Sequence, residues 1–198
     1  MKLLELFSGT GSIGKVAKNL GWEVVSLDLK KADIECDILK WDHTQFDEGE
    51  FDFIWASPPC TEYSIALTRR QRDIPSANKI VQKTLEIIDY LKPKYYVIEN
   101  PQTGYLKVQD FMQGRHYIDI DYCKYGMPYR KRTRLWNNIL DWKPRPLCKK
   151  DCGNIINNKH KATAQRGPNK EYPNNRFEQN ELYMVPSDLI NEIFNNII

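Results

Sequence analysis

The sequence predicts an α/β fold in which helices cover both faces of a mostly parallel sheet. Short apolar or β-branched runs alternate with segments of helical spacing, as expected for parallel strands joined by crossover helices. A chain of 198 residues is long enough for one domain with its own core. Glycines, acids and a cysteine follow the predicted strands, at the sheet edge where folds of this class bind ligands.

The first predicted strand covers residues 2–7 and leads into a segment with two glycines. A helix is expected over residues 13–20, with Ser12 as its N-terminal cap and Gly21 at its end. The β-branched run at residues 23–28 predicts the second strand, which ends on an acidic residue.

The middle of the chain continues this alternation. Residues 34–38 form a weak strand candidate and residues 51–56 a stronger one. Apolar residues at helical spacing predict a helix over residues 77–91, which stops before Pro93. Residues 95–98 are expected to form the next strand.

The last part of the chain is less regular. Residues 117–122 alternate isoleucine with aspartate, which is the pattern of a strand with one wet face, and residues 134–136 are expected to return beside it. Residues 137–181 are rich in Asn, Lys, Gly and Pro and are expected to be irregular. Apolar positions in residues 187–197 predict a closing helix.

Composition excludes several classes of protein. With 41% hydrophobic and 28% charged residues, the chain has the composition of a soluble globular protein. No apolar run approaches the roughly 18 residues of a membrane span, and Glu5 interrupts the N-terminus too early for a signal peptide. Five cysteines are too few and odd in number for a disulfide scaffold, so we expect a cytoplasmic protein. We also expect a monomer.

The net charge of +3 hides an uneven distribution. Residues 130–170 hold twelve Lys and Arg residues against two acids, or +10, and the rest of the chain holds 17 basic and 24 acidic residues, or −7. A basic block on an acidic body suggests a surface that binds polyanions such as nucleic acid. A solvated, lysine-rich loop would explain the same charge.

A Gly-x-Gly sequence joins the first strand to the first helix. Gly9 and Gly11 would let a ligand approach the backbone, and the helix N-terminus offers free amide groups. Asp28, at the end of the second strand, could accept both hydroxyls of a ribose. Ordinary tight turns give the same glycine pattern, so it is the acid that favours a nucleotide-type ligand.

Cys60 is the candidate nucleophile. It follows the strand at residues 51–56, after two prolines that stiffen the turn. Glu99 follows the strand at residues 95–98, so a carboxylate would lie within reach of anything bound beside the thiol. A thiol and an acid suit attack on a heteroaromatic ring and its protonation. The alternative is a buried cysteine that acts as a small hydrophobe.

Arg130, Arg132 and Arg134 alternate along the chain. A strand would aim all three to one side, where they could hold a phosphate or a carbonyl oxygen. The alternative is a solvated basic strand.

Two cysteines and a histidine lie close together inside the basic block. Cys148 and Cys152 are four positions apart, and His160 follows eight positions later. With Cys123 they could complete a tetrahedral zinc site. Such a site would stabilise a loop that is too polar to fold without it. Free thiols are the alternative.

Taken in this order, the segments resemble the cytosine-C5 DNA methyltransferases. The similarity extends over residues 2–136, about two-thirds of the chain. The matching segments are Phe7-Ser8-Gly9-Thr10-Gly11 with Asp28 and Asp37, Pro59-Cys60, Glu99-Asn100, and Arg-Lys-Arg-Thr-Arg at 130–134. The segments at 122–126 and 132–136 look most like compact proteins of this kind encoded by phages and large DNA viruses.

The resemblance implies a Rossmann-like S-adenosylmethionine-dependent methyltransferase fold, with a mostly parallel seven-stranded sheet and helices on both faces. It also implies a set of cofactor-binding residues. These are Phe7, Gly9 and Gly11 at the methionine end, Asp28 at the ribose, Asp37 at the adenine amino group, Leu29 and Ile38 against the ring, and Pro59.

For the reaction, the resemblance implies that the target cytosine is flipped out of the DNA helix. Cys60 would add to ring carbon 6 while Glu99 holds the ring nitrogen and the exocyclic amine. Carbon 5 would take the methyl group, and loss of its proton would release the cysteine. Arg132 and Arg134 would contact the base carbonyl and keep the thiol ionised.

Two segments are expected to contact DNA. One is the basic segment 130–170. The other is a mobile loop at residues 61–75 that carries Arg69, Arg70 and Arg72 and would close over the DNA. An ordinary exposed loop is the alternative for these three arginines.

The chain departs from the family pattern in several places. Thr61 stands where Gln is usual, Pro101 where Val is usual, and Arg130 where Gln usually begins the arginine signature. The long target-recognition region is missing. We therefore expect a catalytic core at 1–136, a basic irregular segment at 137–181 in place of that region, and a C-terminal helix at 182–198 packed on the core.

The sequence thus favours a DNA (cytosine-5-)-methyltransferase. One alternative is a non-catalytic nucleic-acid-binding protein on the same fold. Another is a C5 methyltransferase of RNA or single-stranded DNA, which a small recognition surface would suit. A methyltransferase of amino groups is disfavoured, because its site needs an aromatic residue after the proline pair, where this chain has Cys60.

Overall fold

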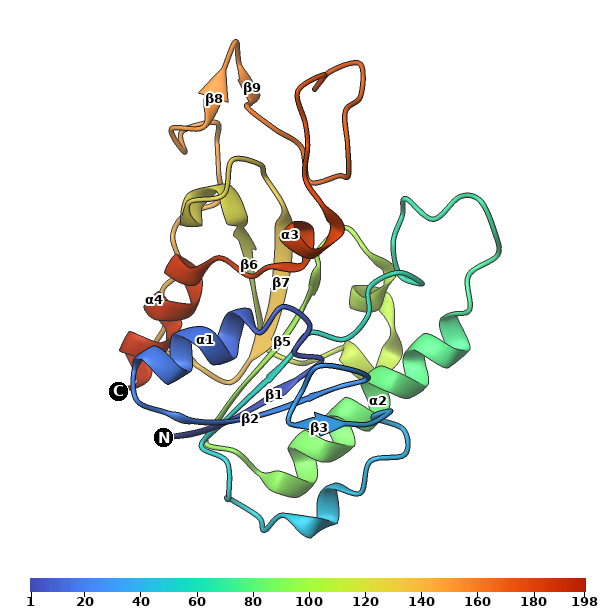
Figure 1. Ribbon diagram of the computed structural model, residues 1–198, viewed down its shortest axis with the longest axis vertical. Coiled ribbons are helices and arrows are strands. Elements are labelled where there is room, and N and C mark those ends of the chain that lie inside the picture. Colours follow the sequence, from blue (N-terminus) through green and yellow to red (C-terminus); the bar gives the residue numbers. More distant parts are fainter.

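A computed structural model describes all 198 residues, and its centre is a sheet of seven strands in the order β3-β2-β1-β4-β5-β7-β6 (Figure 1). Neighbouring strands from β3 to β5 pair in parallel, whereas β7 pairs antiparallel with both β5 and β6. The predicted mostly parallel α/β fold is confirmed. The strands are β1 (Lys2–Leu6), β2 (Glu23–Asp28), β3 (Ile34–Glu35), β4 (Phe53–Ala56), β5 (Tyr95–Pro101), β6 (Tyr117–Asp121) and β7 (Arg132–Asn137).

Helices cover both faces of this sheet. On one face α1 (Ser12–Asn19) lies beside α4 (Ser187–Ile197), and α2 (Ile74–Leu91) covers the other (Figure 1). The short helix α3 (Gln179–Tyr183) precedes α4. The 3-10 turns are η1 (His43–Gln45), η2 (Tyr105–Val108), η3 (Asp110–Met112) and η4 (Tyr122–Tyr125). None of the helices combines the length and apolar character that a membrane crossing requires.

The limits of α2 follow from its local sequence. The Asp73 side chain accepts the Ser76 N–H at 3.1 Å and caps the helix, with a proline in the first turn. The helix ends at Leu91, where Lys92 adopts a left-handed conformation. The predicted end is confirmed, and the start lies at Ile74 instead of residue 77 because of the aspartate cap.

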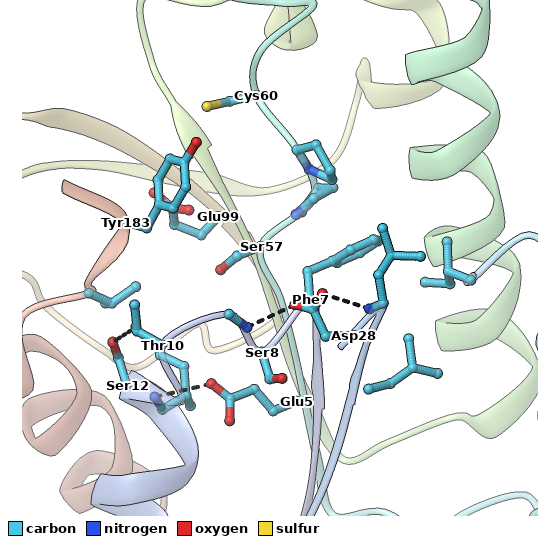
Figure 2. Close-up of a pocket in the computed structure, with 18 of the residues that line it drawn as sticks. Glu5, Phe7, Ser8, Thr10, Ser12, Asp28, Ser57, Cys60, Glu99 and Tyr183 are labelled. Carbon is cyan, nitrogen blue, oxygen red and sulfur yellow. Dashed lines mark hydrogen bonds between the residues drawn. The ribbon is translucent and has the colours of Figure 1, made fainter. Parts of the chain in front are cut away.

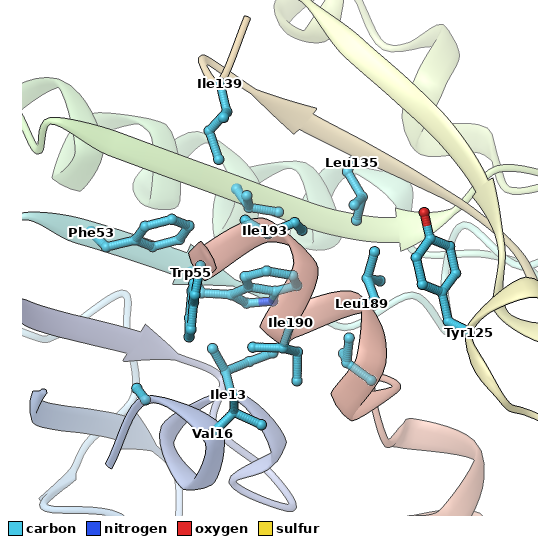
Figure 3. Close-up of a cluster of buried hydrophobic side chains, with 14 of the residues drawn as sticks. Ile13, Val16, Phe53, Trp55, Tyr125, Leu135, Ile139, Leu189, Ile190 and Ile193 are labelled. Atoms are coloured by element: carbon cyan, nitrogen blue, oxygen red, sulfur yellow. The ribbon is translucent and has the colours of Figure 1, made fainter. Parts of the chain in front are cut away.

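Two buried clusters fix the helices to the sheet, one on each face. The first joins α1 and α4 to Phe53 and Trp55 of β4, with Leu189 and Ile193 of α4 buried against them (Figure 3). Burial of one such side chain contributes about 1.5–3 kcal/mol. The C-terminal helix is therefore an integral part of the core.

Three predicted local features differ in the structure. β3 covers only Ile34–Glu35, because its pairing with β2 stops where β2 ends. Gly11 rather than Ser12 is the N-cap of α1, and the Ser12 hydroxyl bonds to Thr10 at 2.6 Å. Residues 137–181 are mostly irregular, as predicted, but contain the strand pair β8 (Ile155–Ile156) and β9 (Lys159–His160) and the start of α3.

Candidate active site

The carboxyl ends of the central strands surround a cavity of about 570 Å³, a size typical of small-molecule sites. It lies where the strand order switches, since β1 has β2 on one side and β4 on the other. The cavity extends from the loop after β1 to the turn after β4 (Figure 2). The predicted site residues that line it are Phe7, Gly9, Asp28, Leu29, Asp37, Ile38, Pro59, Cys60 and Glu99.

The loop after β1 turns through left-handed backbone conformations. Phe7 has a φ of 59°, which is unusual for a bulky residue, and its side chain lines the cavity. Gly9 and Gly11 have φ values of 48° and 65°. Gly11 does not line this cavity, because it turns the chain into α1 as the helix cap. Its place at the methionine end of a cofactor stays a prediction.

Glu5 is a site residue that the sequence interpretation missed. Glu5 is 3% exposed, and its carboxylate accepts the N–H groups of Ile13 at 3.2 Å and Gly14 at 3.0 Å. These bonds satisfy two amides in the first turn of α1 that have no partner within the helix. Burial raises the pKa of Glu5 to about 7. A Cβ atom at Gly14 would lie 2.6 Å from the carboxylate, so glycine is needed there. An acid inside an apolar strand, just ahead of a helix, is the sequence signal that marks this residue.

Asp28 connects β2 to the glycine loop. One carboxylate oxygen accepts the Gly9 N–H at 2.9 Å and the other accepts the Leu29 N–H at 2.6 Å. Beside it, Leu29 is 67% exposed whereas Ile38 is buried. Together with Asp37, these residues give one end of the cavity two acids and two apolar side chains.

Cys60 lies at the other end of the cavity, on the turn after β4. The Asn100 amide donates a hydrogen bond of 2.9 Å to the main-chain carbonyl of Pro58 and so fixes this turn to β5. Burial, and after it the Glu99 carboxylate, raise the pKa of the Cys60 thiol, while Lys131 acts in the opposite direction. The thiol is therefore protonated at neutral pH when no ligand is bound.

Glu99 is held in place by a buried tyrosine. The Tyr122 hydroxyl donates to one Glu99 oxygen at 3.0 Å, and Tyr122 is fully buried. The Lys131 Nζ atom lies 3.9 Å from the same oxygen. This arrangement fixes the carboxylate and leaves its second oxygen for a ligand.

Lys131 is the cation at the Cys60 end of the cavity. β7 pairs Leu135 with Glu99, and paired residues of antiparallel strands share one face of the sheet. Because side chains alternate along a strand, Lys131 lies on the Glu99 side and Arg132 and Arg134 lie on the opposite side. Strand alternation alone could not show which set faces the site.

The two arginines form ion pairs with the neighbouring strand. Arg132 donates to both oxygens of Asp121, at 3.0 and 2.8 Å, and Arg134 donates to both oxygens of Asp119, at 2.7 and 2.9 Å. Neither arginine lines the cavity. In this structure both arginines thus pair with aspartates, and their contact with a bound base and the thiol stays a prediction.

A short helix near the C-terminus completes the wall of the cavity. Asn180 and Tyr183 of α3 line it, and Figure 2 shows the Tyr183 hydroxyl pointing toward the Cys60 end. The Lys131 ammonium donates to the main-chain carbonyl of Leu182 at 3.1 Å and ties this helix to the start of β7. The sequence interpretation missed this helix because it has only five residues and none is buried.

The loop after Cys60 carries the three predicted DNA-contacting arginines. Arg70 forms an ion pair with Glu62, and the Arg72 guanidinium lies 5.0 Å from the centre of the Tyr105 ring. Arg69 is exposed. Two of the three side chains thus stabilise the loop itself in this conformation.

The four predicted metal ligands come together in the structure. The ligand atoms of Cys123, Cys148, Cys152 and His160 all lie within 4.8 Å of one another. None of these residues lines the cavity.

Comparisons with known proteins show the family of this chain. Residues 1–103 match the family described as C-5 cytosine-specific DNA methylase. A protein of Frog virus 3 (isolate Goorha), named "Probable DNA (cytosine-5)-methyltransferase", is 38% identical over an alignment 174 positions long that covers 80% of this chain and 80% of the viral protein.

Solved structures share the fold. The Entamoeba histolytica methyltransferase EhMeth aligns with a TM-score of 0.56 over 74% of this chain and 56% of that chain, at 17% identity. The S. pombe Dnmt2 methyltransferase aligns with a TM-score of 0.50 over 74% of this chain and 52% of that chain, at 16% identity. This chain spans about half the length of these structures. The predicted Rossmann-like methyltransferase fold is confirmed.

Proposed function

Because this chain belongs to the C-5 cytosine-specific DNA methylase family, we propose that its Cys60 and Glu99 direct the transfer of a methyl group from S-adenosylmethionine to carbon 5 of cytosine in DNA. Family membership confirms the resemblance in the motifs and makes the chain an S-adenosylmethionine-dependent methyltransferase. The observation that supports the residue roles is that one cavity holds both the glycine loop and the Cys60–Glu99 pair.

The lining of the cavity fits the cofactor. Four acids, Glu5, Asp28, Asp37 and Glu99, line it against two lysines, Lys31 and Lys131, which favours a cationic ligand such as a sulfonium. When bound, S-adenosylmethionine supplies an activated methyl group. The residues proposed to hold it are Phe7, Gly9 and Gly11 at the methionine end, Asp28 at the ribose hydroxyls, Asp37 at the adenine amino group, Leu29 and Ile38 against the ring, and Pro59.

In the proposed reaction, a cytosine flipped out of the DNA enters beside Cys60. The thiolate adds to ring carbon 6, while Glu99 holds the ring nitrogen and the exocyclic amine. The new sulfur–carbon bond makes carbon 5 nucleophilic, so that it accepts the methyl group. Loss of the carbon 5 proton then restores the ring and expels Cys60 as a thiolate.

The thiol must be ionised before it can attack. Burial and Glu99 raise the pKa of Cys60, and Lys131 is the nearby cation that lowers it. We therefore assign to Lys131 the electrostatic role that the sequence motif gave to Arg132 and Arg134.

DNA is proposed to bind along the basic segment 130–170. The eight Lys and Arg residues between positions 143 and 170 are all exposed, as needed for contacts with phosphates. Arg69, Arg70 and Arg72 would join this surface when the loop closes. We further propose that segment 137–181 takes the place of a target-recognition region, and that the protein acts as a monomer in the cytoplasm.

Methyl transfer from labelled cofactor tests the proposal. The protein and its Cys60→Ser variant are incubated with duplex DNA, single-stranded DNA or RNA, and the modified nucleoside is identified. We expect 5-methylcytosine in DNA from the parent and none from the variant. Product in RNA alone would change the substrate class. The absence of product on every substrate, with nucleic-acid binding unchanged in Cys60→Ala, would favour a non-catalytic binding protein.

A further inference from the structure

Three cysteines and one histidine, from three separate segments, converge outside the cavity. Cys123 lies in η4, Cys148 and Cys152 lie in the loop that follows β7, and His160 lies in β9. Their ligand atoms lie within 4.8 Å of one another, and the Cys148 sulfur lies 3.5 Å from the His160 Nε2 atom. All three cysteines are free thiols.

This spacing fits a tetrahedral zinc site. Zn–S bonds of about 2.3 Å and Zn–N bonds of about 2.0–2.1 Å place neighbouring ligand atoms about 3.5–3.8 Å apart. With ligand atoms no more than 4.8 Å apart, the observed cluster needs a contraction of about 1.3 Å at most. Three thiolates and one imidazole are also a ligand set found in structural zinc sites.

The turn after Cys148 supplies a hydrogen-bond donor to its sulfur. The Lys150 N–H donates to the Cys148 sulfur at 3.3 Å, on a turn in which Lys150 adopts a left-handed φ of 71°. Lys124 and Lys149 flank the cluster in sequence, and Lys124 pairs with Asp151 at 3.1 Å. A main-chain amide of this kind orients the Cys148 sulfur and would stabilise it as a ligand once a metal is bound.

The loop that carries the cluster has few buried side chains. Between residues 143 and 184, Cys148 and Asn175 are the buried residues, and the regular structure is limited to β8, β9 and α3. A segment with so few buried side chains gains little apolar burial to offset the cost of ordering its backbone. A bound metal is one way to supply the missing stability.

The cluster also reaches the catalytic sheet. Cys123 is buried in the turn that follows β6, and the Cys148 N–H donates at 2.9 Å to Asp121, the last residue of that strand. Asp121 in turn pairs with Arg132 of β7. A metal at the cluster would therefore hold the basic loop against β6 and β7, next to the catalytic cavity.

We propose that Cys123, Cys148, Cys152 and His160 bind one structural zinc ion that folds the basic segment onto the end of β6. Zinc binding takes up the three sulfurs as thiolates and releases their protons to solvent. This site does not depend on the assignment of the reaction, because its residues lie outside the catalytic cavity.

Metal analysis of the protein purified with zinc in the buffer tests the proposal. We expect one zinc per chain after desalting. Replacement by Co²⁺ should give the sulfur-to-metal charge transfer and the intense visible bands of a tetrahedral thiolate site. In the apo-protein, trypsin should cut first between residues 143 and 178, while the core remains intact.

The same cysteine-to-serine change inside and outside the cluster separates loss of the metal from a general loss of folding. Cys152→Ser should lose the zinc, whereas Cys36→Ser and Cys60→Ser, which remove cysteines outside the cluster, should retain it. His160→Cys should also retain zinc, as a four-cysteine site with a shifted cobalt spectrum. A metal-free parent with a protease-resistant loop, an octahedral cobalt spectrum, or a disulfide among the three cysteines would overturn the proposal.

Discussion

The side-chain amide of Asn100 donates a hydrogen bond of 2.9 Å to the main-chain carbonyl of Pro58. Asn100 follows Glu99 on β5, and Pro58 lies two residues before Cys60 on the turn after β4. One buried hydrogen bond between adjacent strands therefore sets the acid and the thiol relative to each other. The Glu-Asn and Pro-Cys pairs are thus one structural unit.

Asn100→Ala is expected to loosen this unit. Loss of a buried hydrogen bond costs about 1–3 kcal/mol, and release of the turn should speed alkylation of Cys60 and lower kcat for methyl transfer. Urea unfolding and the rate of iodoacetamide modification measure the two effects. Asn138→Ala is the control, because Asn138 also bonds to the main chain but at the far end of the sheet. An unchanged alkylation rate in Asn100→Ala would contradict this account of the turn.

Lys131→Met is expected to make Cys60 less reactive. Lys131 lowers the pKa of the thiol, so its loss should move the alkylation profile to higher pH and reduce methyl transfer at neutral pH. The pH dependence of Cys60 modification gives the measurement. Arg130→Met, which removes an exposed charge one residue earlier, should leave the profile in place. Equal shifts in the two variants would contradict a specific role for Lys131, because any nearby positive charge would then have the same effect on the thiol.

Arg134→Met should affect stability rather than the thiol. Arg134 donates to both oxygens of Asp119 on the face away from the cavity, and loss of such a pair costs about 2 kcal/mol. The variant should unfold at lower urea concentration and keep the parent's Cys60 alkylation profile. A clear shift of that profile would restore the arginine to the active site.

Glu5→Gln tests a charge buried beneath the glycine loop. Burial raises the pKa of Glu5 from its usual 4.5 to about 7, so the folded protein binds this proton more tightly than the unfolded chain does. The free energy of unfolding should therefore fall as pH rises from about 4.5 to 7, by about 3 kcal/mol from this group. Above pH 7 the loss is complete.

The glutamine variant has no such proton to lose. The difference in urea midpoint between parent and variant should therefore change across this pH window and be constant on either side. A difference that does not depend on pH would show that Glu5 keeps an ordinary pKa in the folded protein.

The order of strands and helices was predictable because its signals are local. Alternation, helical spacing, prolines and glycines act within a few residues, and α4 was predicted with the same limits, Ser187–Ile197. The polar residues at the strand ends were predictable for the same reason, since the carboxyl ends of parallel strands meet at one edge.

Features that depend on register and tertiary contacts were not predictable. Which face of β7 meets the cavity depends on the pairing of Leu135 with Glu99, and that pairing puts Lys131 at the site. The role of Glu5 depends on a helix that packs above its strand. The Cys/His cluster was predicted from residue type, although Cys123 joins it from a distant turn.

The central claim is that Cys60 bonds to the target cytosine, and DNA that contains 5-fluorocytosine tests it most directly. A fluorine at carbon 5 replaces the proton whose removal would release Cys60. The elimination is therefore blocked, and the adduct should persist through denaturation. With cofactor present, the account predicts a stable protein–DNA complex whose cross-linked peptide contains Cys60, and no complex from Cys60→Ser. A parent protein that binds both cofactor and DNA yet forms no adduct, or forms it through another residue, would contradict the account.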